Sequence, residues 1–143
     1  MKISTRGRYA LRVMIDLAEH NSGEYIPLRD VAEREEISEK YLESILPALT
    51  KAGFLDGLRG KGGGYRLARP AESYTVGSVL KLVEGSFAPV ACLDCTPNKC
   101  PRVGQCRTLP MWEKLYENLN RFFEGITIAD LCRDTAEGGN FVI

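Results

Sequence analysis

The sequence predicts a mainly α-helical fold that carries one small β-hairpin. Two observations lead to this prediction. Apolar residues recur at helical spacing in most segments of the chain, and a glycine-rich run, Gly60–Gly64, separates two short β-forming segments. With 143 residues, 44% of them hydrophobic and 27% charged, the chain has the size and composition of about one globular domain with a modest appended element.

Three helices are expected before the hairpin, over residues 4–20, 28–34 and 38–52, because each stretch has one apolar face. Ser38 is the expected N-cap of the third helix, since its hydroxyl can accept a hydrogen bond from an otherwise unpaired backbone N–H. Pro47 lies inside this helix. We expect it to kink the helix without breaking it, because the apolar stripe continues to Leu49.

The hairpin is predicted from two short strands, at residues 54–55 and 65–67, with Gly60–Gly64 as a flexible tip. A phosphate-binding loop is the obvious alternative for such a glycine run. Its spacing does not fit, because Lys61 is followed by Gly62 and no helical pattern comes after the glycines. We therefore reject a nucleotide site here.

The second half of the chain contains a helix over residues 75–84, an aperiodic segment over 86–107, a long helix over 108–124 and a short helix over 127–133. Thr108 is expected to cap the long helix, and Thr127 and Asp130 have capping-box spacing for the short one. These elements divide the chain into residues 1–70, a linking helix and loop over 71–107, helices over 108–134, and a tail over 135–143.

Three helices followed by a glycine-tipped hairpin are the order of a winged helix-turn-helix, in which the third helix enters the major groove of DNA. The net charge of zero at first argues against nucleic acid, but its distribution does not. Residues 1–12 hold four basic and no acidic side chains, and residues 51–69 hold five basic and one acidic, so each segment carries +4. Two local basic segments favour binding to a polyanion.

The candidate DNA-binding residues lie in three places, namely the N-terminal segment, the exposed face of the third helix and the hairpin. Glu43 could accept from a cytosine amine, and long side chains on the hairpin could reach a minor groove or phosphates. The predicted set is Lys2, Ser4, Arg6, Arg8, Ser38, Glu39, Lys40, Tyr41, Glu43, Arg59 and Lys61.

Four cysteines, Cys92, Cys95, Cys100 and Cys106, fall within fifteen residues of the aperiodic segment. In a chain without a secretion signal, such a group is more often a metal or redox site than a set of disulfides. Thiolates suit both zinc and iron–sulfur clusters. An iron–sulfur cluster is favoured over zinc, because only one C-x2-C pair is present, and a metal-free loop is the third reading. Cys132 stands apart and is interpreted as a small packed side chain.

The chain resembles the Rrf2 family of bacterial transcription regulators over roughly residues 1–134. The resemblance rests on Ser4–Arg12, on Ser38 with Tyr41-Leu42-Glu43, on Arg59-Gly60-x-Gly62-Gly63-Gly64-Tyr65, and on Ile126–Leu131. It implies a homodimer formed through the long helix at 108–124, which places two wings on a palindromic operator in double-stranded DNA. It also implies that Glu43 and Arg59 matter for base and minor-groove readout.

The resemblance also bears on the cysteines. Cluster-binding members carry three cysteines in this loop, and Cys92, Cys100 and Cys106 match them. The fourth ligand stays open, because this chain has Leu109 where one member has a histidine ligand and Arg8 where another has an aspartate ligand. Cys95 is the candidate fourth ligand, and both a 2Fe-2S and a 4Fe-4S cluster, expected to be labile, remain open.

The sequence therefore predicts a DNA-binding regulator, most simply a repressor, whose operator binding responds to a cluster or to thiol state in the cysteine loop. The alternatives are a cluster-free regulator of cysteine or sulfur metabolism controlled by a protein partner, and a DNA-binding protein with structural zinc. An enzyme or electron carrier is not expected, because no catalytic constellation accompanies the thiols. No apolar run of about 18 residues and no apolar signal core are present, so we expect a cytoplasmic protein without membrane contact.

Overall fold

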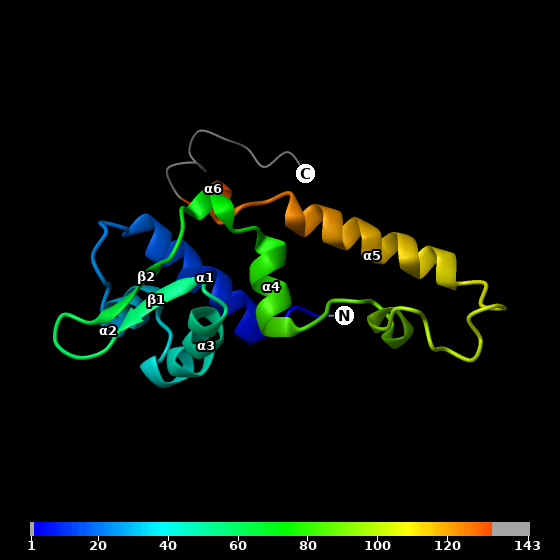
Figure 1. The fold of residues 1–143 in the computed structure, drawn as a ribbon, viewed down its shortest axis with the longest axis horizontal. Helices are drawn as coiled ribbons and strands as arrows, with labels where there is room; N and C mark the ends of the chain where they lie inside the picture. Colours follow the sequence, from blue (N-terminus) through cyan, green and yellow to red (C-terminus); the bar gives the residue numbers. More distant parts are fainter. Residues whose placement is uncertain (1, 133–143) are drawn as a thin grey trace.

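The structure, a computed structural model, describes residues 2–132. The chain is elongated, with the β-hairpin at one end and the cysteine-containing loop at the other (Figure 1). The elements follow in the order α1 (Thr5–Glu19), α2 (Leu28–Glu35), α3 (Glu39–Lys51), β1 (Leu55–Leu58), β2 (Gly64–Leu67), η1 (Ala71–Ser73), α4 (Val76–Glu84), η2 (Ala91–Asp94), α5 (Leu109–Glu124) and α6 (Ile128–Leu131).

The first three helices begin and end at signals that the sequence carries. Ser4 caps α1 by accepting from the Gly7 N–H at 3.2 Å, and Ser38 caps α3 by accepting from the Tyr41 N–H at 3.1 Å. Helix α3 continues past Pro47 to Lys51, so the predicted absence of a break is confirmed. The helices occur where the apolar periodicity placed them, within one or two residues.

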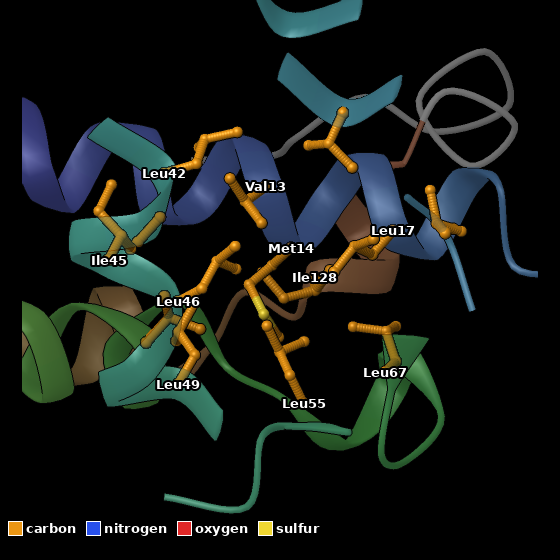
Figure 2. Close-up of a cluster of buried hydrophobic side chains, with 14 of the residues drawn as sticks. Val13, Met14, Leu17, Leu42, Ile45, Leu46, Leu49, Leu55, Leu67 and Ile128 are labelled. Carbon is orange, nitrogen blue, oxygen red and sulfur yellow. The ribbon is translucent and has the colours of Figure 1, made fainter. Parts of the chain in front are cut away.

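The main core lies between α1, α3, the hairpin and α6 (Figure 2). Met14 from α1, Leu46 from α3 and Leu55 from β1 are at most 2% exposed. Ile128 from α6 joins them and is 0% exposed, so the C-terminal short helix closes the same core as the N-terminal helices. This core fixes the orientation of α3 against α1.

The hairpin is a two-stranded antiparallel sheet in which Leu55 pairs with Leu67 and Leu58 pairs with Gly64. An additional bridge joins Tyr65 to Ile26 in the loop between α1 and α2, with both N–H···O distances at 2.8 Å. Gly64 permits this approach, because a Cβ atom there would lie 2.0 Å from the Ile26 carbonyl oxygen. The base of the hairpin is therefore fixed to the body of the chain.

Helix α4 links this body to α5. A capping box of Thr75 and Ser78 starts α4, and a second capping box of Thr127 and Asp130 starts α6. A smaller core cluster centred on Val76, Leu80 and Phe87 packs against one side of α5. Helix α5 contributes no buried residue, and its apolar side chains Met111, Leu115 and Phe122 are 54%, 38% and 39% exposed.

Four expectations need correction, and the fourth concerns the end of α6. Thr108 precedes α5, but its side chain makes no capping hydrogen bond and lies against Cys106 instead. Strand β1 begins at Leu55 and extends to Leu58, beyond the predicted pair, because the backbone stays paired through Asp56 and Gly57. The predicted loop 86–107 contains a short 3₁₀ helix, η2, that no periodicity indicated.

Helix α6 ends at Leu131, two residues before the predicted end. The predicted tail over residues 135–143 lies outside the described residues. Across residues 2–132, no helix is both long and apolar enough to cross a bilayer.

Candidate nucleic-acid interface

Helix α3 presents a polar surface that its own core contacts leave open. Leu42, Ile45 and Leu46 point into the core and are at most 1% exposed. The polar residues on the other face of this helix and at its N-cap are exposed. Tyr41 is half-buried and makes an edge-to-face contact with Tyr9, with 5.2 Å between ring centroids. The exposed set is Ser38, Glu39, Lys40, Glu43 and Ser44.

The hairpin carries Arg59 and Lys61 at its exposed tip. Its base is held by Arg66, which stacks over the Tyr25 ring at 4.2 Å and donates to the Gly23 carbonyl at 2.8 Å. Arg66 thus supports the hairpin, whereas Arg59 and Lys61 extend beyond it. This division of the basic residues was not visible from their shared sequence segment.

The basic N-terminal segment lies beside α3. Arg6 donates from Nη2 to the Ser44 carbonyl at 2.9 Å, and Arg8 donates to Thr5 Oγ1 at 3.0 Å. Ser4 uses its hydroxyl both to cap α1 and to donate to Glu84 Oε1 at 2.7 Å. Lys2 and Arg8 are exposed. Of the predicted N-terminal residues, the structure thus brings Arg6 against α3, whereas Ser4 contacts α4 and Arg8 contacts its own helix.

An ion pair behind this surface joins α1 to α2. The Asp16 carboxylate, 1% exposed, accepts from Arg34 Nη2 at 2.8 Å and Nε at 3.0 Å. This hydrogen bond raises the pKa of Arg34, so the guanidinium stays charged. The bidentate geometry is the form of ion pair that best offsets the cost of burying a carboxylate. It fixes α2 relative to α1 and hence the turn that leads into α3.

The segment that carries the four loop cysteines connects α4 to α5. It lies at the opposite end of the molecule from the hairpin (Figure 1). Cys95 is exposed, and Cys92, Cys100 and Cys106 are half-buried. As a donor set, four thiols suit iron or zinc. Within residues 2–132, however, no three His, Cys, Asp or Glu side chains are grouped closely enough to hold a metal ion. The chemistry of the loop thus fits a metal, and its arrangement here is not that of an assembled ligand set.

Cys106 has the most distinctive surroundings of the four. Its Sγ lies 3.4 Å from Thr108 Oγ1. The Thr108 hydroxyl lowers the pKa of the Cys106 thiol, and the backbone N–H groups at the start of α5 act in the same direction. A thiol that ionises more readily is a better metal ligand and a better nucleophile. Cys132, by contrast, donates from Sγ to the Ile128 carbonyl at 3.3 Å, as a packed side chain does.

Comparison with known proteins decides the family. The model of the Rrf2 family, described as an iron-dependent transcriptional regulator, matches residues 3–134. The chain belongs to the Rrf2 family. The predicted fold, the predicted function of a DNA-binding transcriptional regulator and the prediction that it is not an enzyme are confirmed by this membership and by the relatives.

Individual Rrf2 relatives agree along nearly their whole length. Protein rrf2 of Nitratidesulfovibrio vulgaris is 40% identical over 136 residues, which cover 95% of this chain and 90% of that protein. Among solved structures, T. potens IscR has a TM-score of 0.76 at 34% identity, covering 98% of this chain and 92% of that one. CymR, the global cysteine regulator of B. subtilis, has a TM-score of 0.75 at 28% identity, covering 98% and 99%.

One contact near the interface was missed by sequence reasoning. Glu84, the last residue of α4, accepts hydrogen bonds from Ser4 and packs against Gly7 of α1. A signal for it exists in the sequence, since Gly7 interrupts an otherwise regular helical pattern, and an isolated helical glycine often marks a close approach. The partner, Glu84, is 80 residues from Ser4 along the chain, too far for spacing to reveal.

Proposed function

We propose that this Rrf2 regulator is a homodimeric repressor whose operator binding responds to an iron–sulfur cluster held by the cysteine loop. Cys92, Cys100 and Cys106 would be ligands and Cys95 the fourth. The observation that carries the proposal is the pairing of an open, polar α3 surface with a separate four-thiol loop in one chain. One element can contact DNA while the other changes its ligands.

The DNA contacts proposed are those of the exposed α3 face, the hairpin tip and the N-terminal segment. Glu43 and Ser38 lie on α3 where base edges and phosphates would be met, and Arg59 and Lys61 extend from the hairpin. A regulator of chromosomal promoters works in the cytoplasm, where we place this protein.

The proposed dimer forms through α5. Three large apolar side chains on this helix are more than a third exposed although the helix packs on one side against α4 and Phe87. An amphipathic helix with apolar side chains on its outward face is stabilised by a second helix that covers them. A two-fold dimer would set two copies of α3 against a palindromic site.

The iron–sulfur cluster is the third part of the proposal, after the DNA contacts and the dimer. The description of the family as iron-dependent and the match to IscR support it, as does the lowered pKa of Cys106. When bound, the cluster would supply a redox-sensitive and iron-dependent link between the loop thiols. Such a cluster requires deprotonated thiols, and the contact with Thr108 favours the thiolate form of Cys106.

The deciding experiment is anaerobic purification and reconstitution with ferrous iron and sulfide, followed by iron and sulfide analysis. Operator DNA is obtained by selecting duplexes from a random-sequence library with the wild-type protein. Cys100→Ala should abolish incorporation, Cys95→Ala should do so if Cys95 is the fourth ligand, and Cys132→Ala is the matched control that should retain the cluster. A wild-type chain that stays free of iron and sulfide contradicts the cluster.

A second candidate is a cluster-free regulator controlled through thiol state or a protein partner. The likeness to CymR, a global cysteine regulator, favours it. In that case the reconstituted protein would be colourless and would still bind the selected duplex. A structural-zinc protein is distinguished by stoichiometric zinc that chelation removes together with the folded loop.

A further inference from the structure

Glu84 stands between the cysteine loop and the rest of the chain. It ends α4, and Gly85 follows with a positive φ of 82° before the chain enters the loop. Its Oε1 accepts from the Ser4 backbone N–H at 2.8 Å and from the Ser4 hydroxyl at 2.7 Å. These two hydrogen bonds join the start of the cysteine loop to the start of α1.

The first turn of α1 is shaped to receive this carboxylate. A Cβ atom on Gly7 would lie 2.2 Å from Glu84 Oε1, so a glycine at this position is what permits the contact. Ser4 is also the N-cap of α1, and the unpaired N–H groups of the first turn favour a negative charge nearby. Any displacement of Glu84 therefore alters the cap of α1 as well as its own hydrogen bonds.

The same turn of α1 reaches α3 on the other side. Arg6 donates from Nη2 to the Ser44 carbonyl at 2.9 Å, and the Tyr9 ring contacts the Tyr41 ring. Ser44 and Tyr41 belong to the α3 face proposed to bind DNA. A continuous set of contacts thus extends from the residue before the cysteine loop, through the start of α1, to the recognition surface.

We propose that Glu84 is the positioning residue that transmits the state of the cysteine loop to α3, through Ser4 and Arg6. This inference rests on the proposed function, because it requires the loop to have two states. Coupling between two sites requires a physical element that each state of the loop holds differently. Glu84 is placed for this role, since it directly precedes Gly85, where the chain leaves α4 for the loop, and it bonds to Ser4 at the start of α1.

The experiment compares Glu84→Ala with wild type as the full-length dimer. The dissociation constant for the selected duplex is measured for protein reconstituted with ferrous iron and sulfide and for protein treated with a chelator. A ratio between the two forms of about tenfold in wild type lies within the usual range for such coupling. In Glu84→Ala we expect the ratio to fall to within about twofold of one.

Two further variants keep the test clear if Glu84→Ala folds poorly. Glu84→Gln retains an oxygen that can accept from Ser4 and should give an intermediate ratio. Glu124→Ala is the matched control. Glu124 is the last residue of α5, and its carboxylate contacts the opposite end of α4, where it accepts from Thr75 Oγ1 at 2.8 Å and lies against Gly77. Its contacts do not include the first turn of α1, so its ratio should equal that of wild type.

Amide hydrogen exchange provides a readout that is independent of DNA. The Gly7 and Arg8 N–H groups bond to Ser4, so Glu84→Ala should speed their exchange and Glu124→Ala should not. If wild type responds to iron and sulfide but Glu84→Ala responds equally, the role of Glu84 is overturned and the proposed function stands. If wild type itself does not respond, both are overturned.

Discussion

The winged-helix end and the cysteine-loop end of this elongated molecule are stabilised in different ways. The winged-helix end surrounds a core in which Met14, Leu46 and Leu49 are at most 1% exposed. The other end consists of the cysteine loop and the first turns of α5, and α5 holds no buried residue along its length. The first region is stabilised by a closely packed apolar core, whereas the second leaves large apolar side chains of α5 more than a third exposed.

This difference shows where function can be regulated. A well-packed core resists change, because its side chains fit one arrangement. Segments with few buried contacts open at low cost in free energy, and binding-competent loops are drawn from them. The recognition surface is thus presented by the rigid end, and ligand-dependent change is expected at the other end.

The sharpest test of the comparison uses one leucine from each end. Leu46→Ala should lower the free energy of unfolding by about 3 kcal/mol, because it leaves a cavity in the core. Leu115→Ala, at a side chain that is 38% exposed, should lower it by about 0.5 kcal/mol or less in the dissociated chain. Urea denaturation at low protein concentration measures both. Equal losses would mean that α5 is as well packed as the core.

The same leucine tests the dimer. Sedimentation equilibrium of Leu115→Ala should show weaker self-association than wild type, whereas a Leu46→Ala protein that remains folded should associate normally. A monomeric wild type at all concentrations would remove α5 from the proposed interface.

Ion pairs give a second, smaller contrast, between the winged-helix region and α5. Arg34→Gln leaves the buried Asp16 carboxylate without its charged partner and should cost about 2 kcal/mol of stability. Arg121→Gln removes an ion pair to Glu117 on α5, where both side chains are more than half exposed, and should cost at most about 0.5 kcal/mol. Thermal unfolding of the two variants beside wild type measures both losses of stability.

The charges at the hairpin tip should matter for DNA and not for stability. Arg59→Ala and Lys61→Ala should each flatten the slope of log affinity against log salt by about one unit, because each would remove a proposed phosphate contact. Lys114→Ala on α5, also exposed, is the control and should leave the slope unchanged. Slopes that stay the same in the hairpin variants would exclude the tip from the interface.

The smallest expected effect concerns the pKa of Cys106. Thr108→Val removes the hydroxyl that lowers this pKa, so in metal-free protein the pH midpoint for alkylation of Cys106 should move upward. At neutral pH the thiolate fraction, and with it the alkylation rate, should fall. Thr96→Val, beside the exposed Cys95, is the control. Peptide mapping after iodoacetamide treatment at several pH values measures the rates.

How far the sequence alone could predict this structure depends on the distance between interacting residues. Ser38 and the pair Thr127 and Asp130 act within a single turn, and their caps were predicted correctly. Apolar periodicity likewise placed the stripe that contains Leu42 and Leu46. These features depend on local geometry, which a sequence states directly.

Thr108 shows where local reasoning fails. It has the right residue type and position for a cap, yet its backbone is helical and its hydroxyl lies against Cys106. The Glu84 contact with Ser4 and the two roles of the hairpin arginines depend on residues far apart in the chain. Such pairs follow from the packing of helices. A single sequence can mark one side of such a contact, as Gly7 does, but it does not identify the partner.

The bridge between Tyr65 and Ile26 has a consequence for the DNA that this protein can accept. Because it joins the base of the hairpin to the same body that carries α3, we expect these two proposed DNA-binding elements to keep a constant separation. Inserting one base pair between the bases met by α3 and the groove met by the hairpin shifts them by about 3.4 Å along the duplex axis. Half-sites of altered internal length should therefore be rejected, even where every contacted base is retained.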